Sequence, residues 1–419
     1  MTIPRFLQIH TLHSYTGALL NRDDSGLAKR LPYGGVMRTR ISSQCLKRHW
    51  RKAEDDPHAL LKIEGAKAAE AFRSREIVTI KVIDPLRSQF SPQTVDMLDT
   101  LFQTQVYGEK GVDKKSRQTL IFGAPEVRWL AERARELAPR IEEALANIPN
   151  PSAEEKSGGK GKKGKKTPRS LPEEIEAIVK PWRENFSDNL KALREQAALN
   201  VGLASALFGR MVTSDPAANI DAPIHVAHAF TVHEEETEGD YFTAVDDLKR
   251  EEDDGGADTI QETELTSGIF YGYVVIDVPG LVSNLTGCER KDWLSKETDR
   301  TLPAEVVHNL IYLIAEISPG AKLGSTAPYG RAELVLVEAG DRQPRSLATA
   351  FRNPTEPKVA DTTQRLKRHL EQMDKDYETG EARRALHCLN EDLPRSQRAS
   401  LRSLAEWARA AVVAGEAKP

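Results

Sequence analysis

The sequence has few cysteines, and their spacing excludes two kinds of site. The 419 residues contain Cys45, Cys288 and Cys388, which lie far apart along the chain. A disulfide framework and a Cys-x-x-Cys metal pair are therefore excluded, and a reducing cytosol fits this composition. We expect a cytoplasmic protein with no cofactor.

Long hydrophobic runs are also absent. The longest uncharged stretches, 197–209 and 265–276, are much shorter than the roughly 20 apolar residues that span a bilayer. Arg5, Gln8 and His10 interrupt the N-terminus, so we expect no signal peptide there. The sequence also lacks a Walker loop, a GxGxxG loop and a Ser-His-Asp elbow. We therefore expect no membrane partner and none of these reactions.

Neither sign of charge dominates the chain, but charge is unevenly distributed. Lys and Arg number 59 and Asp and Glu number 63, a formal net charge of −4 that excludes a globally basic nucleic-acid binder. Residues 1–52, however, hold ten Lys or Arg against two Asp, a net charge of +8. Residues 234–264 hold fourteen Asp or Glu against two basic residues, a net charge of −12. This asymmetry points to a polyanionic partner at the N-terminal end.

Hydrophobic periodicity predicts a mixed fold of helices and strands. The expected strands are 6–12, 224–232, 269–278 and 332–337, and the expected helices are one capped by Ser42-Ser43 and one at 302–317. This order is that of a βαββαβ fold, which is ferredoxin-like and also hosts RNA recognition, with two long insertions. The chain from 58 to 210 reads as mainly helical, and the rest, from about 345, reads as helices. Tyr271 and Tyr273 fit core packing and RNA contact equally well.

One segment, 149–166, is rich in Lys and Gly and has low complexity. Such a composition cannot bury apolar area, so we expect a surface loop. It is either a tethered basic arm for nucleic acid or a solvated, dispensable insertion.

The basic N-terminal segment has the composition of a phosphate site. Gly34-Gly35 precedes a run of residues that enters the expected helix at Ser42-Ser43. Backbone N–H groups at a helix start, two hydroxyls and nearby cations can bind phosphate. The cations are Arg38, Arg40, Lys47, Arg48, Arg51 and Lys52. A capped amphipathic helix with a solvated cationic face explains the pattern equally well.

Several segments, in order, resemble the CasC family, the repeated backbone subunit of the type I-E CRISPR surveillance complex called Cascade. They are 20–24, 34–48, 206–214, 228–233, 240–248, 267–271 and 319–322. The resemblance covers roughly 1–55 and 195–330 and is weak at 58–190 and after 340.

This resemblance implies a non-catalytic subunit that binds CRISPR RNA and is shaped like a hand. The fold would be α+β, with a modified ferredoxin-like, RNA-recognition palm. Its parts would be palm at 1–57, helical fingers at 58–210, further palm at 211–340 with a thumb at about 235–266, and a C-terminal helical region at 341–419 that completes the palm. Copies would polymerise head to tail along the guide and present it for pairing with target DNA in antiviral defence. The expected partners are CRISPR RNA, target DNA through the guide, further copies, and the other Cascade subunits (the large subunit, the small subunit and the guide-end caps).

The resemblance also implies which residues bind the guide. They are Asn21, Arg22, Lys29, Arg40, Ser42, Ser43, Gln44, Lys47, Arg48, Arg51, Met211 and Lys322. Met211 would lie between guide bases, whereas the ordinary role of a methionine is core packing. Tyr241, Phe242 and Thr243 would form the thumb wedge. The acidic residues around the wedge should repel phosphate, so they either face solvent or meet cations of a neighbouring copy.

An enzyme is the alternative function. Asp23-Asp24 follows the first strand, and backbone subunits of related type III complexes cut RNA with an aspartate in a comparable loop. A carboxylate with a divalent cation could activate a 2′-hydroxyl or water. Arg22 gives Asp23 an ordinary ion-pair partner, and the motif resembles the non-cutting type I-E pattern, so cleavage is not expected.

His225, His228 and His233 raise the possibility of a metal site. On one strand, only His225 and His233 share a side, and they would lie roughly 26 Å apart. We therefore expect strand histidines satisfied by hydrogen bonds, with no metal.

Overall fold

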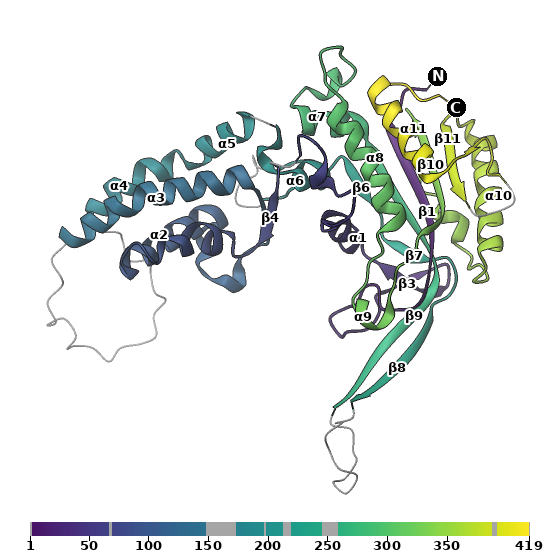
Figure 1. The fold of residues 1–419 in the computed structure, drawn as a ribbon, viewed down its shortest axis with the longest axis horizontal. Coiled ribbons are helices and arrows are strands. Elements are labelled where there is room, and N and C mark those ends of the chain that lie inside the picture. Colours follow the sequence, from purple (N-terminus) through teal and green to yellow (C-terminus); the bar gives the residue numbers. More distant parts are fainter. Residues whose placement is uncertain are drawn as a thin grey trace, which may run out of the picture. The chain divides into compact units, whose positions relative to one another are not determined.

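The computed structural model describes residues 2–66, 69–147, 173–196, 198–212, 219–244, 259–387 and 392–418. The chain forms two compact units, unit 1 (Met1–Lys67 and Ala222–Pro419) and unit 2 (Ala68–Asp221). Each unit has a hydrophobic core of its own. Figure 1 labels most of the helices and strands that the text names.

Unit 1 is built on a sheet whose strands are mostly antiparallel. Its four central strands are, in spatial order, β10 (Ala332–Gly340), β1 (Phe6–Ala18), β9 (Thr259–Asp277) and β7 (Ala229–Thr231), and each runs antiparallel to the next. The other strands are β2 (Arg30–Tyr33), β3 (Val36–Ile41), β6 (Ile224–Val226), β8 (Glu236–Ala244), β11 (Ala382–His387) and β12 (Gln397–Arg398). The prediction of an α+β fold is confirmed.

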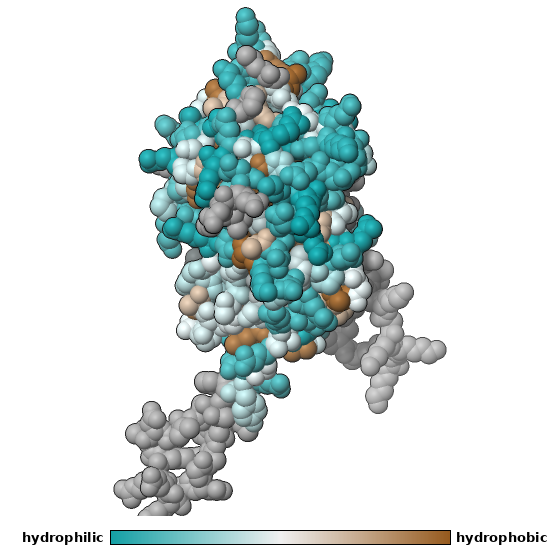
Figure 2. Space-filling model, turned by 90° about the vertical axis from the view of Figure 1, so that its right-hand side faces the viewer, coloured by the Kyte–Doolittle hydropathy of each residue, from teal (hydrophilic) through white to brown (hydrophobic). Residues whose placement is uncertain are grey.

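Helices cover both faces of this sheet, so that β1 is buried on both sides. The helices of unit 1 in the described residues are α1 (Ser43–Arg51), α7 (Val278–Thr286), α8 (Thr301–Glu316), α9 (Leu323–Thr326), α10 (Val359–Tyr377) and α11 (Leu401–Ala414). On one face, Leu12 and Leu336 pack with Leu366 of α10 and with Phe351. Seen from the α10 side, the surface is mainly hydrophilic, with hydrophobic residues in small separate groups (Figure 2).

A buried polar network lies on the α10 face of the sheet. The backbone N–H of Leu347 donates to Tyr271 Oη (2.9 Å), whose hydroxyl contacts His10 Nδ1 (2.9 Å). His10 Nε2 contacts Glu338 Oε2 (3.1 Å), and Glu338 also accepts from Arg383 Nε (2.6 Å). Burial lowers the pKa of His10, so the ring is neutral and donates its Nε2–H to Glu338. Every polar atom named in this chain of contacts has a partner.

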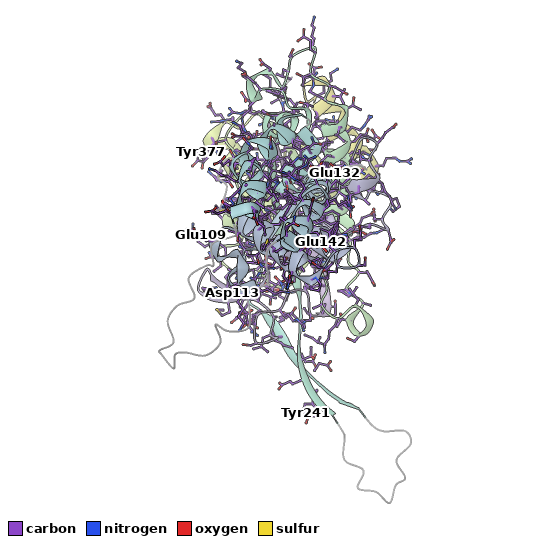
Figure 3. The ribbon with its side chains drawn as sticks, turned by 90° about the vertical axis from the view of Figure 1, so that its left-hand side faces the viewer. Glu109, Asp113, Glu132, Glu142, Tyr241 and Tyr377 are labelled. Atoms are coloured by element: carbon purple, nitrogen blue, oxygen red, sulfur yellow. The ribbon has the colours of Figure 1, made fainter. Side chains whose placement is uncertain are left out.

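The strands β8 and β9 form a hairpin that projects from the sheet (Figures 1 and 3). Glu264 of β9 accepts a hydrogen bond from the N–H of Ala28 (2.7 Å), and Arg30 pairs with both Glu264 and Glu235. Two carboxylates of the acidic segment therefore neutralise a cation of their own unit. This pairing fixes the base of the hairpin.

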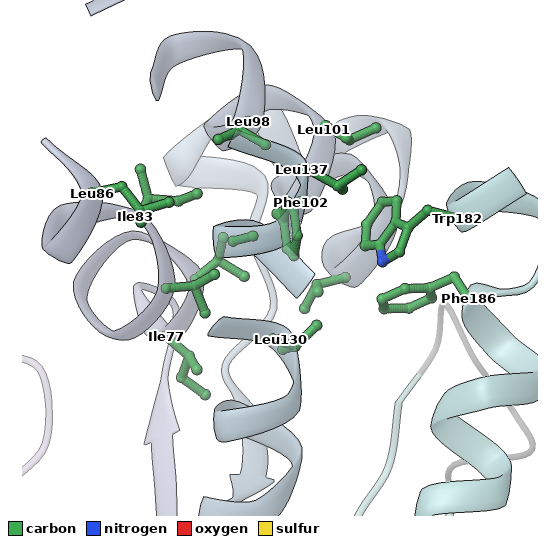
Figure 4. Packing of buried hydrophobic residues seen from close by; sticks show 14 of the residues in the cluster. Ile77, Ile83, Leu86, Leu98, Leu101, Phe102, Leu130, Leu137, Trp182 and Phe186 are labelled. Carbon is green, nitrogen blue, oxygen red and sulfur yellow. The ribbon is translucent and has the colours of Figure 1, made fainter. Parts of the chain in front are cut away.

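Unit 2 is mainly helical. Its helices are α2 (Pro92–Tyr107), α3 (Ala124–Asn147), α4 (Glu173–Glu184), α5 (Phe186–Gln196) and α6 (Leu203–Phe208). The rings of Phe102 and Phe186 lie 4.6 Å and 5.2 Å from Trp182 in its core (Figure 4). Unit 2 also contains a two-stranded sheet of β4 (Ala71–Ser74) and β5 (Leu120–Gly123), which the sequence did not indicate.

Two further predictions of secondary structure were wrong. The expected strand 224–232 is divided into β6 and β7, because the three residues between Val226 and Phe230 oppose only two residues of β9. His228 lies in this break and is exposed, so it does not share a buried face with Phe230. The region after 345 is not wholly helical, since β11 pairs with β10 at the edge of the sheet.

Candidate nucleic-acid interface

The loop that follows β1 is tied to the start of α1. Asn21 Oδ1 accepts a hydrogen bond from the N–H of Ser42 (2.9 Å). The N–H of Lys29 donates to the carbonyl of Asn21 (2.9 Å), and the N–H of Arg40 donates to the carbonyl of Lys29 (2.7 Å). An isolated β-bridge joins Arg22 to residue 28. These bonds bring together three of the predicted guide-binding cations, Arg22, Lys29 and Arg40, beside the start of α1.

Most backbone N–H groups at the start of α1 already have acceptors within the chain. Ser42 is the N-cap, as predicted, and its Oγ accepts from the N–H of Cys45 (3.3 Å). His228 Nδ1 accepts from the N–H of Ser43 (3.1 Å). In the first turn, the N–H of Gln44 has no acceptor among the described residues. The prediction that the helix N–H groups cradle phosphate is therefore wrong for most of them, and anion binding here depends on side chains.

Four cations beside α1 form what we call the basic surface: Arg22, Lys29, Arg40 and Arg48. Within the described part of the chain, none of the four makes an ion pair. Arg22 and Arg48 are exposed, and the buried Nε of Arg40 has no hydrogen-bond partner there. Cations in this state are available to an external polyanion.

The positive charges of the basic surface affect the pKa of two side chains, His228 and Cys45. Burial lowers the pKa of His228, and the nearby charges of Arg40 and Lys29 lower it further. Burial raises the pKa of the Cys45 thiol, while Arg48 and Lys29 oppose that shift. Lys29 therefore lies near both His228 and Cys45, as do Arg40 and Arg48 respectively.

Other cations of the N-terminal segment do not belong to this surface. The guanidinium of Arg38 is fully buried and donates to the carbonyls of Tyr33, Thr231 and Phe351, each at 3.1 Å. The prediction that Arg38 surrounds a phosphate site is wrong, because Arg38 instead joins β3 to its neighbours. Lys52 forms an exposed pair with the nearby carboxylate of residue 54 at 2.8 Å.

The remaining predicted guide-binding residues of unit 1 lie around the same helix. Lys47 and Arg51 are on α1, where Arg51 Nε donates to the carbonyl of Lys47 (3.3 Å). The hydroxyl of Ser43 contacts Gln44 Oε1 (3.4 Å). Ala321, next to Lys322, donates its N–H to the carbonyl of Leu19 (2.8 Å), so Lys322 also lies near the loop that follows β1.

Met211 and the predicted wedge lie elsewhere in the chain. Met211 belongs to unit 2 and is 70% exposed, which excludes core packing in this structure. Tyr241 is 63% exposed and lies on the projecting hairpin (Figure 3). Phe242 and Thr243 belong to β8, but their side chains lie outside the described residues, as does segment 149–166.

The side chain of Asp23 stabilises its own loop. Asp23 Oδ1 accepts hydrogen bonds from the N–H groups of Ser25 (2.9 Å) and Leu27 (3.1 Å). Such contacts are typical of an aspartate that closes a turn. The carboxylate therefore already has a structural role, whereas Asp24 is exposed.

The three histidines of the β6–β7 region have different surroundings. His228 contacts α1, and His233 Nε2 accepts from the N–H of Ile269 (3.0 Å). Across the described ranges, no group of three or more His, Cys, Asp or Glu side chains could hold a metal ion. The expectation of histidines satisfied by hydrogen bonds holds for both ring nitrogens of His233 and for Nδ1 of His228, while His225 is exposed.

Two residues of interest were missed from the sequence. The sequence pattern places His228 in a regular strand, whereas in the structure its ring accepts a hydrogen bond from the start of α1. Tyr329 is 78% exposed in the loop after Lys322. The sequence signal for its exposure is its position between Pro328 and Gly330, because proline and glycine favour a turn.

No helix in the described part of the chain has the length and apolarity needed to cross a bilayer.

Two solved structures share the fold over 97% of this chain. One is a chain of a "CRISPR RNA-guided surveillance complex, pre-nicking", with a TM-score of 0.72, 24% identity and 100% of that chain covered. The other is a chain of a "CRISPR RNA-guided surveillance complex", with a TM-score of 0.52, 20% identity and 99% covered.

Sequence comparison gives the family. A search of curated proteins finds no match. The family model described as "CT1975-like protein", a model of Cas proteins, matches residues 7–410, which is nearly the whole chain. The chain therefore belongs to the CT1975-like family of Cas proteins.

Proposed function

We propose that this chain is a non-catalytic backbone subunit of a type I-E, CasC-like Cascade complex, and that it binds CRISPR RNA. The observation that carries this proposal is the basic surface, whose four cations have no ion-pair partner among the described residues. Membership of a Cas family and a fold shared with chains of CRISPR RNA-guided surveillance complexes support it.

In this proposal, the sheet of unit 1 is a ferredoxin-like palm. Its strand order β10-β1-β9-β7 is the order that a βαββαβ chain forms, which supports the assignment. The basic surface binds phosphates of the guide, and binding releases counterions from the RNA. Base pairing, rather than the protein, then reads the target DNA.

The projecting β8–β9 hairpin is the proposed thumb, and unit 2 supplies the fingers. Tyr241 is exposed on the hairpin and can stack on a base. Met211 is exposed on unit 2 and offers a flexible apolar contact to another base. Copies would join head to tail in the cytoplasm and assemble with the other Cascade subunits.

The proposal that the subunit does not cut RNA is supported by the structural role of Asp23, whose Oδ1 accepts two backbone N–H groups. Assembled complex should leave a complementary RNA intact in the presence of magnesium or manganese. Regularly spaced cuts that disappear in Asp23→Ala or Asp24→Ala would place the chain among the enzymes.

The RNA that accompanies the protein tests the proposed function as a whole. The chain should be purified from cells that also make a CRISPR transcript and the other subunits, and the bound RNA should be sequenced. We expect RNA of one discrete length with repeat-derived ends. Protein that carries no RNA, or an unselected mixture of cellular RNA, would overturn the proposal.

A further inference from the structure

We propose that His228 is a neutral hydrogen-bond donor to the backbone of bound RNA, held in a single tautomer by the start of α1. The inference rests on the proposed function, because it adds a residue to the basic surface. It assigns to His228 a role in which one ring nitrogen faces the protein and the other faces the nucleic acid.

The tautomer follows from one hydrogen bond. The N–H of Ser43 points at His228 Nδ1 at a distance of 3.1 Å, so Nδ1 must be the acceptor. In a neutral imidazole the proton then lies on Nε2, which makes Nε2 a donor. A second proton on Nδ1 would set two N–H groups against each other and detach the contact with α1.

The surroundings of the ring favour the neutral form. Partial burial, Arg40 and Lys29 all act against the protonated ring. The side chain is exposed and lies in the break between β6 and β7, whereas Ala229 and Phe230, the first residues of β7, are buried in separate clusters. Within the described residues, Nε2 has no hydrogen-bond acceptor.

The ligand chemistry follows from this geometry. A donor N–H without an acceptor, exposed beside Arg40 and Lys29, suits an oxygen acceptor of a polyanion. In RNA that acceptor is a phosphate oxygen or the ribose 2′-hydroxyl. A neutral donor adds a directional contact without a formal charge, so its contribution to binding should not depend on counterion release.

Two substitutions of His228 separate its two proposed contacts. In His228→Asn, the short amide keeps an oxygen near the position of Nδ1 but loses the distal donor. In His228→Gln, the longer amide can replace the distal donor but loses the acceptor for Ser43. His225→Asn is the matched control, because His225 is an exposed histidine of the neighbouring strand β6.

The experiment measures binding of the full chain to a fluorescent single-stranded RNA across a salt series. His228→Asn should melt at the native temperature yet bind about fivefold to tenfold more weakly, the typical effect of one lost hydrogen bond. The slope of log affinity against log salt should not change. His228→Gln should bind more tightly than His228→Asn, and His225→Asn should match the native chain. A DNA of the same sequence distinguishes the two acceptors. If His228 contacts a phosphate, His228→Asn should bind both RNA and DNA more weakly than the native chain does. If it contacts the 2′-hydroxyl, only RNA binding should weaken.

The inference fails if the native chain binds RNA and His228→Asn binds it equally well. It also fails if ¹⁵N NMR of the free protein near neutral pH shows the proton of His228 on Nδ1. A native chain that does not bind RNA would instead contradict the proposed function. The two failures are therefore distinguishable.

Discussion

Arg210, the residue before the exposed Met211, forms an ion pair with Glu126 in which both side chains are buried. Their side chains are 2% and 0% exposed, and Arg210 Nη1 lies 2.8 Å from Glu126 Oε2. The same carboxylate oxygen accepts from the N–H of Gly123 (2.8 Å), and Arg210 also donates to the carbonyl of Ile121 (3.3 Å). The pair thus joins β5 and α3 to the segment that presents Met211.

Glu126→Gln should strongly destabilise unit 2, because it removes the negative charge of a buried partner of the Arg210 guanidinium. Removing one partner of a buried pair typically costs about 3–5 kcal/mol. Hydrogen exchange of the amides of α3 measures the effect locally.

The control for this substitution is Glu176→Gln in the same unit. Glu176 pairs with Arg183 at 3.1 Å, and both side chains are 39% exposed. An exposed pair typically contributes about 1 kcal/mol or less. Equal protection losses in the two variants would show that the buried pair has no special role.

The elements that the sequence predicted well are those whose local pattern and final burial agree. The Ser42 cap, the apolar helix α8 and the first half of strand β1, which is buried throughout, are examples. The candidate surface could be predicted in outline for a similar reason, since cations cluster around a recognisable cap.

The features that the sequence did not predict depend on distant partners. Strand β11 contains Arg, Ala and Leu, which favour helices, yet it becomes a strand because β10 offers an edge. Arg38 resembles its cationic neighbours in the sequence, but carbonyls from residues 231 and 351 make its burial possible. Ser43 and His228 are 185 residues apart, so no local pattern could reveal their contact.

The buried network around His10 makes stability depend on pH. His10 stays neutral in the folded chain because its pKa lies below the ordinary 6.5. The unfolded chain takes up a proton as the pH falls below about 6.5, so the free energy of unfolding decreases by up to about 1.4 kcal/mol per pH unit. Burial tends to raise the pKa of Glu338, but the contacts with His10, Arg383 and Arg345 lower it overall. The stabilising contribution of Glu338 is therefore present above pH 4.5 and is lost as the pH falls through its lowered pKa.

His10→Gln should reduce the slope of the free energy of unfolding against pH between pH 6.5 and 5, because glutamine does not titrate. The reduction should correspond to the uptake of about one proton fewer on unfolding. Urea denaturation at a series of pH values measures the slope. The exposed His225→Gln should keep the native slope. If His10→Gln and the native chain show the same slope, His10 does not titrate in this way.

Removing the basic surface should change the salt dependence of RNA binding. Each phosphate contact contributes a slope of roughly 0.7 for a single strand, so replacing Lys29, Arg40 and Arg48 together by Ala should reduce the slope by about 2. The loss should be similar for all RNA sequences, because phosphate contacts carry no sequence information.

A charge-matched triple variant is the control for this experiment. Lys358, Lys375 and Arg402 are cations at or near the ends of α10 and α11, and replacing them by Ala removes the same formal charge. That variant should keep nearly the native slope. If both triple variants lose the same slope, RNA responds to net charge and the basic surface has been misplaced.

The accessibility of bases along the bound guide tests most directly whether this subunit organises RNA at regular intervals. Assembled complex should be treated with a base-specific probe, and one base in each interval should react while its neighbours stay protected. Tyr241→Ala should blur this periodic pattern, because loss of an aromatic contact to a base typically costs about 1–3 kcal/mol. Tyr377→Ala, which removes an exposed tyrosine from the end of α10, should leave the pattern intact. A uniform reactivity profile in the native complex would contradict the proposed role of the hairpin and of the subunit as a guide-organising backbone.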